Sequence, residues 1–262
     1  MKEPIQLNTW EDFERELVTI SDQTTVLQQE GKLSRVEYPI FRGVKNAEYH
    51  LESTLDRIKK EMKRSDYITK VKIVRDHIAT CTGRKWDLET KEPKIFLGGF
   101  DLPLSVYEFM VYLRHNGFPS PLIDWTKSPY IAAFFAFGDV YSKAEHASIF
   151  VHRGDVMCEG SPSIWRLGSS IKTFRTHYLQ QSEYTICFRK EEDEIYFANH
   201  EEVKEDVEGQ GVLIRYDIPI SERQKVLKKL DSMNITAYSL FGSEPSLMET
   251  LALREVVFNM EN

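Results

Sequence analysis

The chain has 262 residues, of which 41% are hydrophobic and 29% are charged, a balance typical of a folded globular protein. Its 41 acidic and 34 basic residues give a formal net charge of −7. This net charge argues against a protein that binds nucleic acid mainly through the phosphates, because such binding needs a basic surface. The longest strongly apolar run, Tyr130–Phe137, is far shorter than the roughly 20 residues of a membrane-spanning helix, so no membrane partner is expected.

The cysteines indicate a reducing environment. Cys81, Cys158 and Cys187 lie far apart and form no CxxC pair, so neither a disulfide framework nor a structural zinc site is expected. The N-terminal residues lack the apolar segment of a secretory signal. We therefore expect a cytoplasmic protein folded as one domain over residues 1–262, with an N-terminal helical segment over residues 1–35.

Hydrophobic periodicity predicts mainly helices in the first half of the chain. Thr9 can cap the first helix, because Asp12 follows three residues later in a box-like arrangement. The first helix carries Trp10, Phe13, Leu17 and Ile20 on one face, and a strand over Val36–Arg42 follows, with Pro39 indicating an edge or irregular start. Two further helices are expected: a lysine-rich one over Arg57–Thr80 with Ile58, Met62, Val71, Val74 and Ile78 inward, and one over Leu104–Asn116 that Gly117 ends.

The second half is richer in predicted strands. An apolar helix over Ser128–Ala144 comes first and should lie in the core. The elements expected after it are strands over Ala147–His152, Glu183–Phe188, Ile195–Ala198 and Val212–Asp217, a helix over Ile220–Met233, a strand over Ile235–Leu240 and a helix over Glu244–Leu253. Because strands and helices do not alternate regularly, the pattern predicts an α+β fold with helices packed early in the chain.

Several common enzyme motifs are missing. The chain has no GxxxxGK[ST] loop, no GxGxxG, no GxSxG and no HExxH, so P-loop, Rossmann, nucleophile-elbow and zinc-protease chemistry are unsupported. No metal ligand set is expected. Two charged stretches each leave two interpretations open. Lys190–Gly211 is a solvated loop or a docking site for a basic partner, and the basic side chains of the Arg57–Thr80 helix form a solvated face or a local nucleic-acid patch.

Three short segments place charged or polar residues beside apolar ones, and burying such groups costs free energy unless they find partners. In the first, Arg42 ends an apolar strand, where a buried guanidinium needs an anionic partner, and Gly43 lets another group approach the backbone closely. The partner of Arg42 is either a structural carboxylate or a ligand.

The second segment runs from His115 to Pro119 and on through Leu122–Thr126, just before the apolar helix. Thr126 or Ser128 can cap that helix, whose N-terminus would then favour an anion. In the third segment, Gln181 and Glu183 lie two residues apart on an extended strand and so point the same way. Each pattern also has a structural interpretation: a cap with a core histidine, and a solvated strand face.

Together the segments resemble the FRG domain family, which is named for the Phe-Arg-Gly triplet found here at residues 41–43. The resemblance covers most of the chain. It includes Glu52–Arg57, the His115-x-Gly117-x-Pro119 and Asp124-Trp125-Thr126 motifs, the Ala132–Ala136 helix and Ser239–Phe241. Ser120-Pro121-Leu122 stands where family members often carry Thr-Arg-Leu, so any role of that family arginine does not carry over.

A more remote resemblance is to ADP-ribosyltransferases with an Arg–Ser–Glu signature, and it implies a split sheet and NAD as the substrate. Arg42 and Gly43 would hold the pyrophosphate, and a carboxylate would stabilise the ribosyl cation as nicotinamide leaves. The remaining roles implied are Glu183 as that carboxylate, Gln181 orienting the acceptor, Thr126 or Ser128 at the nicotinamide ribose, and His115 at the pocket wall.

The resemblance implies an NAD-dependent mono-ADP-ribosyltransferase that acts as a toxin, in anti-phage defence or in a toxin–antitoxin system. Its acceptor would be RNA, DNA or a protein, favouring a nucleic-acid base or a side chain other than arginine, and an antitoxin protein would be a second partner. The alternative is a non-catalytic FRG module that binds a nucleotide or a partner protein. The transferase interpretation predicts that Arg42 and Glu183 line one pocket with Gln181 near its mouth.

Overall fold

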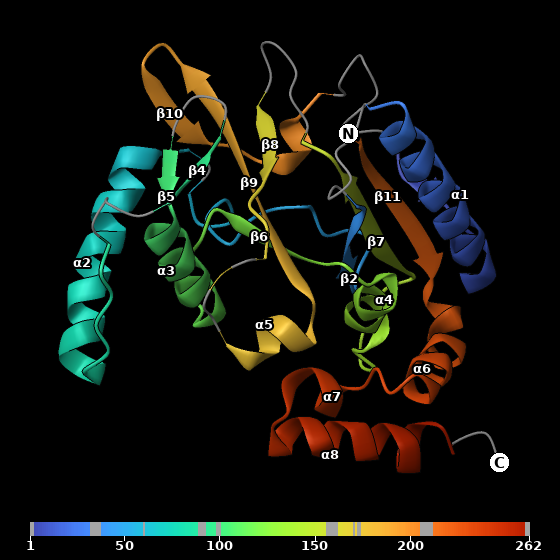
Figure 1. The fold of residues 1–262 in the computed structure, drawn as a ribbon. Helices are drawn as coiled ribbons and strands as arrows, with labels where there is room; N and C mark the ends of the chain where they lie inside the picture. The colour runs from blue at the N-terminus through green and yellow to red at the C-terminus, as the bar shows by residue number, and fades with distance from the viewer. Residues whose placement is uncertain are drawn as a thin grey trace.

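The computed structural model describes residues 3–31, 38–59, 61–88, 93–97, 101–155, 162–169, 171, 174–204 and 212–259. Its centre is a nine-stranded sheet in the order β1-β11-β7-β2-β6-β9-β10-β3, with β8 paired to β9 (Figure 1). The strands are β1 (Ile5–Gln6), β2 (Ile40–Val44), β3 (Met62–Lys63), β6 (Leu122–Thr126), β7 (His146–Arg153), β8 (Ser163–Arg166), β9 (Ser182–Glu191), β10 (Glu194–Phe197) and β11 (Val212–Pro219), while β4 (Lys94–Phe96) and β5 (Asp101–Pro103) form a separate pair.

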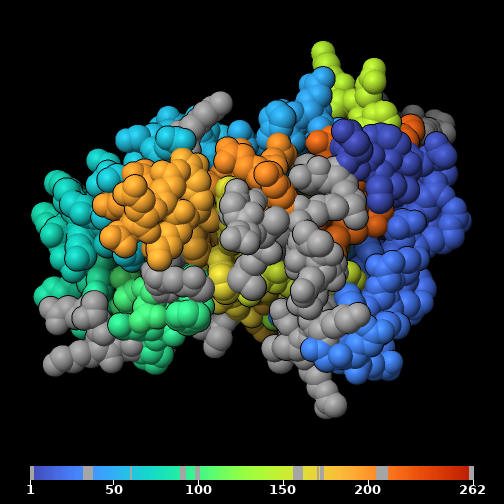
Figure 2. Space-filling model, turned by 90° about the horizontal axis from the view of Figure 1, so that it is seen from above, coloured from blue at the N-terminus to red at the C-terminus, as the bar shows by residue number. Residues whose placement is uncertain are grey.

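Helices pack against the sheet at both ends, and Figure 2 shows α1 at one end of the molecule and α2 at the other. The helices are α1 (Trp10–Gln29), α2 (Arg64–Thr82), α3 (Leu104–His115), α4 (Pro129–Phe137), α5 (Arg175–Leu179), α6 (Arg223–Ser232), α7 (Ala237–Phe241) and α8 (Glu244–Ala252). The α+β class is confirmed, and helices also follow the last strand, as α6 to α8. No helix of the described residues is long and apolar enough to cross a membrane.

Two hydrophobic cores lie side by side beneath the sheet. One joins α2 and α3 to β9, through residues such as Phe109 and Tyr184. The other joins α1, α4 and α6 to β7 and β11, through residues such as Trp10 and Phe137. The boundary between the two cores falls between β6 and β2, where the sheet itself is weakly joined.

At this boundary the sheet is split. Among the described residues, β2 and β6 pair at a single position, Phe41 opposite Thr126. Beyond it the side chain of Arg42 donates to the main-chain oxygen of Asp124 over 2.7 Å, where a continuous antiparallel ladder would place a backbone N–H. The split therefore exposes Arg42, in the middle of β2 and not at a strand end as expected, to the space between the two strands.

The expected elements are largely present. Thr9 caps α1 with Asp12 in a capping box, and α3 ends before Gly117, which has a φ of 82°. Trp10, Phe13 and Ile20 are buried on one face of α1. The four strands expected between residues 147 and 217 correspond to β7, β9, β10 and β11, and the helix expected from Ile220 begins with a 3₁₀ turn before α6.

Four expectations need correction. The helix expected over Arg57–Thr80 begins at Arg64, because residues 62 and 63 pair with β10 as β3, and Ile58 is 71% exposed. The helix expected to reach Ala144 ends at Phe137. The strand expected over Ile235–Leu240 is α7, because Thr236 and Ser239 form a capping box. The strand expected over Val36–Arg42 is β2, which runs from Ile40 to Val44; residues 36 and 37 lie outside the described residues.

Candidate functional site

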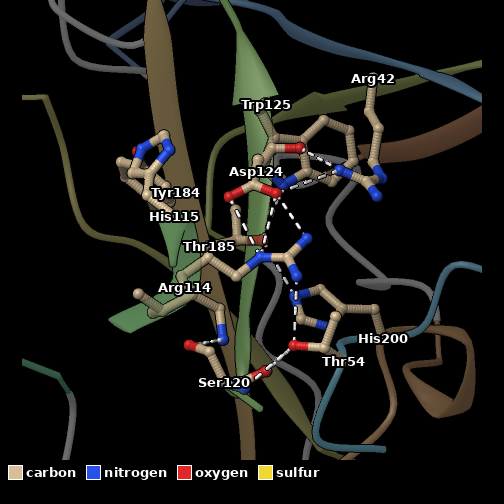
Figure 3. Close-up of polar contacts among 11 residues, drawn as sticks. Arg42, Thr54, Arg114, His115, Ser120, Asp124, Trp125, Tyr184, Thr185 and His200 are labelled. Atoms are coloured by element: carbon tan, nitrogen blue, oxygen red, sulfur yellow. Dashed lines mark hydrogen bonds and ion pairs between the residues drawn. The ribbon is translucent and has the colours of Figure 1, made fainter. Parts of the chain in front are cut away.

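The side chain of Asp124 lies between two arginines from different elements (Figure 3). Arg114, near the end of α3, donates from Nη2 and Nε to Asp124 Oδ2 over 2.6 and 3.1 Å. Arg42 on β2 places Nη1 3.8 Å from the same oxygen. The carboxylate is therefore shared unequally: Arg114 makes its hydrogen bonds, while Arg42 is held mainly through the Asp124 backbone.

These charges set the protonation states at the split. Burial raises the pKa of Asp124, but Arg114 and Arg42 outweigh it, so the pKa lies below its ordinary value and the group is ionised at neutral pH. Burial lowers the pKa of Arg42 to about 10, with Asp124 opposing the shift and Arg114 and Arg57 adding to it. Arg42 therefore stays cationic at neutral pH, and an anionic ligand would relieve its repulsion from the other two arginines.

The Thr54 hydroxyl holds the nitrogen of Arg114 that does not contact Asp124. The Nη1 atom of Arg114 donates to Thr54 Oγ1 over 3.1 Å, and the same oxygen accepts the main-chain N–H of Ser120 over 3.0 Å. The Thr54 hydroxyl is 3.4 Å from the main-chain oxygen of Ser120. Because Thr54 and Arg57 lie on one short segment, this network also holds that segment beside the split.

A cleft of about 520 Å³ opens where β2 and β6 diverge. Its basic lining residues are Arg42, Lys45, Arg57 and Arg114, and Asp124 is its acidic lining residue among the described residues. Lys45 pairs with Asp139 over 2.8 Å. Arg42, whose side chain is 20% exposed, contacts described residues through Nη1, and the exposed Arg57 has no acidic partner in that part of the chain. Both arginines therefore keep N–H groups with which they can bind a ligand.

His115 lines the cleft and begins a chain of hydrogen bonds. Its Nε2 atom is 2.8 Å from the Tyr184 hydroxyl, which is 3.2 Å from Nδ1 of His177, and His177 Nε2 is 3.2 Å from the main-chain oxygen of Ser169. A carbonyl can only accept, so His177 donates from Nε2, Tyr184 donates to His177, and His115 donates from Nε2 to Tyr184. Burial lowers the pKa of both histidines, consistent with these neutral tautomers.

The structure places Thr126 and Ser128, the two alternatives for one site position, differently. Ser128 is the N-cap of α4, and its Oγ accepts the N–H of Ile131 over 3.3 Å. Thr126 is buried, lines the cleft and accepts the N–H of Ser128 over 3.1 Å. Thr126 is therefore the one of the two that the cleft brings together with Arg42 and His115.

Glu183 does not line the cleft, contrary to the expectation that it shares a pocket with Arg42. Its side chain is 1% exposed and accepts the Tyr38 hydroxyl over 2.7 Å. Arg166 lies 3.3 Å and Lys127 3.2 Å from its Oε1 atom. Burial raises the pKa of Glu183, but these partners outweigh it and the carboxylate is ionised. The register separates Glu183 from Asp124, because Glu183 stands opposite Trp125, on the other sheet face from Asp124.

Gln181 is also absent from the described lining of the cleft, whereas its neighbours Gln180 and Ser182 are part of it. The cause is the backbone: Gln181 has a φ of 49° in the turn between α5 and β9, and this left-handed residue interrupts the extended segment on which it was expected to align with Glu183. Gly43 lines the cleft and also lets α4 approach β2, since a Cβ there would lie 1.8 Å from the main-chain oxygen of Ala132.

The sequence analysis assigned no role in the site to Asp124, Arg57 or Arg114, all of which line the cleft. Arg114 directly precedes His115, but a charged residue in the last turn of a helix is common and gave no separate signal. Arg57 was considered only as the first residue of the helix expected over Arg57–Thr80 and as the last residue of the Glu52–Arg57 run. Trp125 has a structural role, because its Nε1 donates to Thr185 Oγ1 over 2.8 Å, and that hydroxyl lies 2.9 Å from His200 Nε2.

Comparison with protein-family models matches residues 37–145 to the FRG domain. The chain therefore carries an FRG domain. The matched residues begin shortly before β2 and end after α4. They include Arg42, Arg57, Arg114 and Asp124, so the basic part of the cleft lies within the domain. The Gln181–Glu183 and Ser239–Phe241 segments lie outside the match. No curated protein and no solved structure matches the chain.

Proposed function

We propose that the FRG domain of this protein binds the phosphates of a nucleotide in the cleft at the sheet split. The observation that carries the proposal is that Arg42, Arg57 and Arg114 all line the cleft, while Asp124, its acidic lining residue among the described residues, is bonded to Arg114. Arg42 and Arg57 retain donors that face the cleft, and a guanidinium matches the planar, two-pronged geometry of phosphate oxygens. The Asp124 carboxylate then serves to orient the arginines rather than to exclude the anion.

NAD is the nucleotide that we propose as the ligand, and ADP-ribosyl transfer is the second candidate function. It is favoured by the ionised carboxylate of Asp124, which lines the same cleft as Arg42. In that reaction the C–N bond between ribose and nicotinamide breaks, and its electron pair leaves with nicotinamide. The acceptor atom then bonds to ribose C1′ and loses a proton. A carboxylate beside the ribose stabilises the positive charge that develops there.

Replacing Arg42 by lysine should weaken NAD and pyrophosphate binding by at least about tenfold, although the charge is kept. Lysine offers a point charge in place of the planar fork, and a charge-assisted hydrogen bond contributes on the order of 1.5–3 kcal/mol. Isothermal titration calorimetry measures the effect. Arg15→Lys on α1 is the matched control, because Arg15 is exposed and lies outside the cleft. Unchanged affinity in Arg42→Lys would show that Arg42 serves only to hold β2 to Asp124.

Incubation with labelled NAD and separate pools of protein, RNA and DNA tests the transferase candidate. We expect label in one pool, and we expect Asp124→Asn to reduce the labelling by about 10²–10³, the usual cost of removing one aligned electrostatic group. Glu183→Gln, assayed below its melting temperature, should still label, because Glu183 lies outside the cleft. NAD that binds without labelling any pool would leave the nucleotide-binding module as the function.

The toxin role, its place in anti-phage defence and the antitoxin partner rest on the transferase candidate. If transfer occurs in cells, expression of the wild-type chain should arrest growth, and expression of Asp124→Asn at the same level should not. Equal growth under both would remove the toxin proposal and leave the binding proposal standing.

A further inference from the structure

A second cavity, of about 460 Å³, is lined by residues of α4, α6, α7 and α8 and adjoins the cationic cleft at the sheet split through Phe135. Figure 1 shows these four helices grouped near the C-terminal end of the chain. The cavity is mostly apolar, and its lining includes Phe134, Phe135, Leu227, Phe241, Leu253 and Val257. Three of these residues are aromatic and contact one another: the Phe135 and Phe241 rings meet edge to face, with centroids 6.2 Å apart, and Phe134 is 5.6 Å from Phe135. Phe135 is 37% exposed, so part of its ring remains open to a ligand.

Two contacts join the apolar cavity to the cationic cleft. Phe135 lines both of them. In addition, Lys45 lines the cleft and Asp139 lines the cavity, and the two side chains pair over 2.8 Å. The two spaces therefore adjoin, with one aromatic ring and one ion pair between them.

The charges of the two spaces are opposite. The cleft carries the arginines, whereas the polar side chains of the cavity include the carboxylates of Asp139 and Glu249. A hydrogen bond from Lys45 lowers the pKa of Asp139, so this group is anionic at neutral pH. Carboxylates repel phosphate but accept hydrogen bonds from amino groups. A ligand that spans both spaces would place its phosphates beside Arg42 and a flat, amino-bearing ring beside Phe135.

We propose that the cavity beside Phe135 is the base subsite of the nucleotide whose phosphates bind in the cleft, and that it takes a purine. This inference rests on the proposed phosphate binding. A purine presents two apolar faces to the phenylalanine rings and polar edges to the carboxylates, and stacking of a base on an aromatic side chain contributes about 1–3 kcal/mol. A free acyl chain would use the apolar wall but leave both carboxylates without a partner from the ligand.

The test compares Phe135→Ala and Phe135→Leu with wild type by calorimetry against ADP, GDP and pyrophosphate. Phe96→Ala is the matched control, because Phe96 is an exposed phenylalanine on β4, outside both cavities. We expect wild type to bind ADP or GDP at least about tenfold more tightly than pyrophosphate, which corresponds to about 1.4 kcal/mol. Phe135→Ala should remove most of that difference, because it should weaken ADP and GDP binding much more than pyrophosphate binding, and Phe135→Leu should remove part of it. Phe96→Ala should bind like wild type.

The outcomes separate the two proposals. If wild type binds neither pyrophosphate nor the nucleotides, the phosphate-binding proposal fails, and the base subsite fails with it. If wild type binds both nucleotides no more tightly than pyrophosphate, or if Phe135→Ala leaves their difference intact, the base subsite is overturned and phosphate binding stands. Tighter binding of an alkyl phosphate than of ADP and GDP would also overturn the purine assignment. A thermal melt of each variant confirms that the protein measured is folded.

Discussion

Replacing Glu183 by glutamine should lower the free energy of unfolding by about 3–5 kcal/mol, although the two side chains have nearly the same shape. Glu183 is 1% exposed and is the acidic partner of Arg166, whose own side chain is 12% exposed, and of Lys127. The amide cannot neutralise these cations, so Arg166 would be left as an uncompensated buried charge. At about 2–4 °C per kcal/mol for a chain of this size, the melting temperature should fall by roughly 10 °C.

A matched control on the same strand separates loss of charge from loss of the buried pair. Glu191 is also on β9 and pairs with Arg189, but its side chain is 53% exposed. Glu191→Gln should change the free energy of unfolding by less than about 1 kcal/mol, because exposed ion pairs contribute little. Urea unfolding of both variants measures the difference. A Glu183→Gln protein as stable as wild type that had lost NAD binding would show that this carboxylate serves a ligand.

The parts of the fold that follow from local chemistry could be predicted from the sequence. The first helix is an example, because the Thr9–Asp12 capping box and the apolar face that follows lie within a few residues of each other. The Ile235–Leu240 segment shows the limit. Its β-branched and apolar residues favour a strand, but Thr236 caps a single helical turn that packs on α8. A short segment of this kind is decided by its contacts more than by its propensity.

The candidate site was predictable only in part, for the same reason. The Phe-Arg-Gly triplet pointed to Arg42 because it combines a charge with apolar neighbours, whereas the Asp-Trp-Thr motif was read for Thr126 and not for Asp124, the carboxylate that lies beside Arg42. The partners of Glu183 could not be predicted, since Tyr38, Lys127 and Arg166 come from three separate parts of the chain. The two-residue spacing of Gln181 and Glu183 assumed an unbroken strand, and the left-handed turn at Gln181 breaks it.

The split also explains why an arginine and a glycine adjoin on β2. The Arg42 side chain replaces a missing ladder contact to Asp124, which requires β2 to diverge from β6. The divergent strand is held instead against α4, through Gly43. One strand thus uses successive residues for two purposes, with the arginine directed to the cleft and the glycine to the helix.

Replacing Gly43 by alanine should be among the most damaging single substitutions in the chain. The new Cβ would lie 1.8 Å from the main-chain oxygen of Ala132 and 2.7 Å from the nitrogen of Ala136, so α4 or β2 must move. Overpacking against side chains costs about 1–3 kcal/mol. Main-chain atoms of a helix yield less readily, so we expect a loss of at least about 3 kcal/mol in the free energy of unfolding.

Gly83→Ala is the control for this prediction, because it separates the steric clash from the general cost of replacing a glycine. Gly83 has a φ of 70° at the end of α2, and a Cβ there meets no atom within 4 Å. Its replacement should cost about 1–2 kcal/mol, the price of a left-handed alanine. Urea unfolding gives both values. In the fraction of Gly43→Ala that stays folded, displacement of β2 should also move Arg42 and weaken pyrophosphate binding, which Gly83→Ala should leave unchanged. If the two variants lose the same stability and both bind pyrophosphate like wild type, then β2 is not held at the split by its close approach to α4.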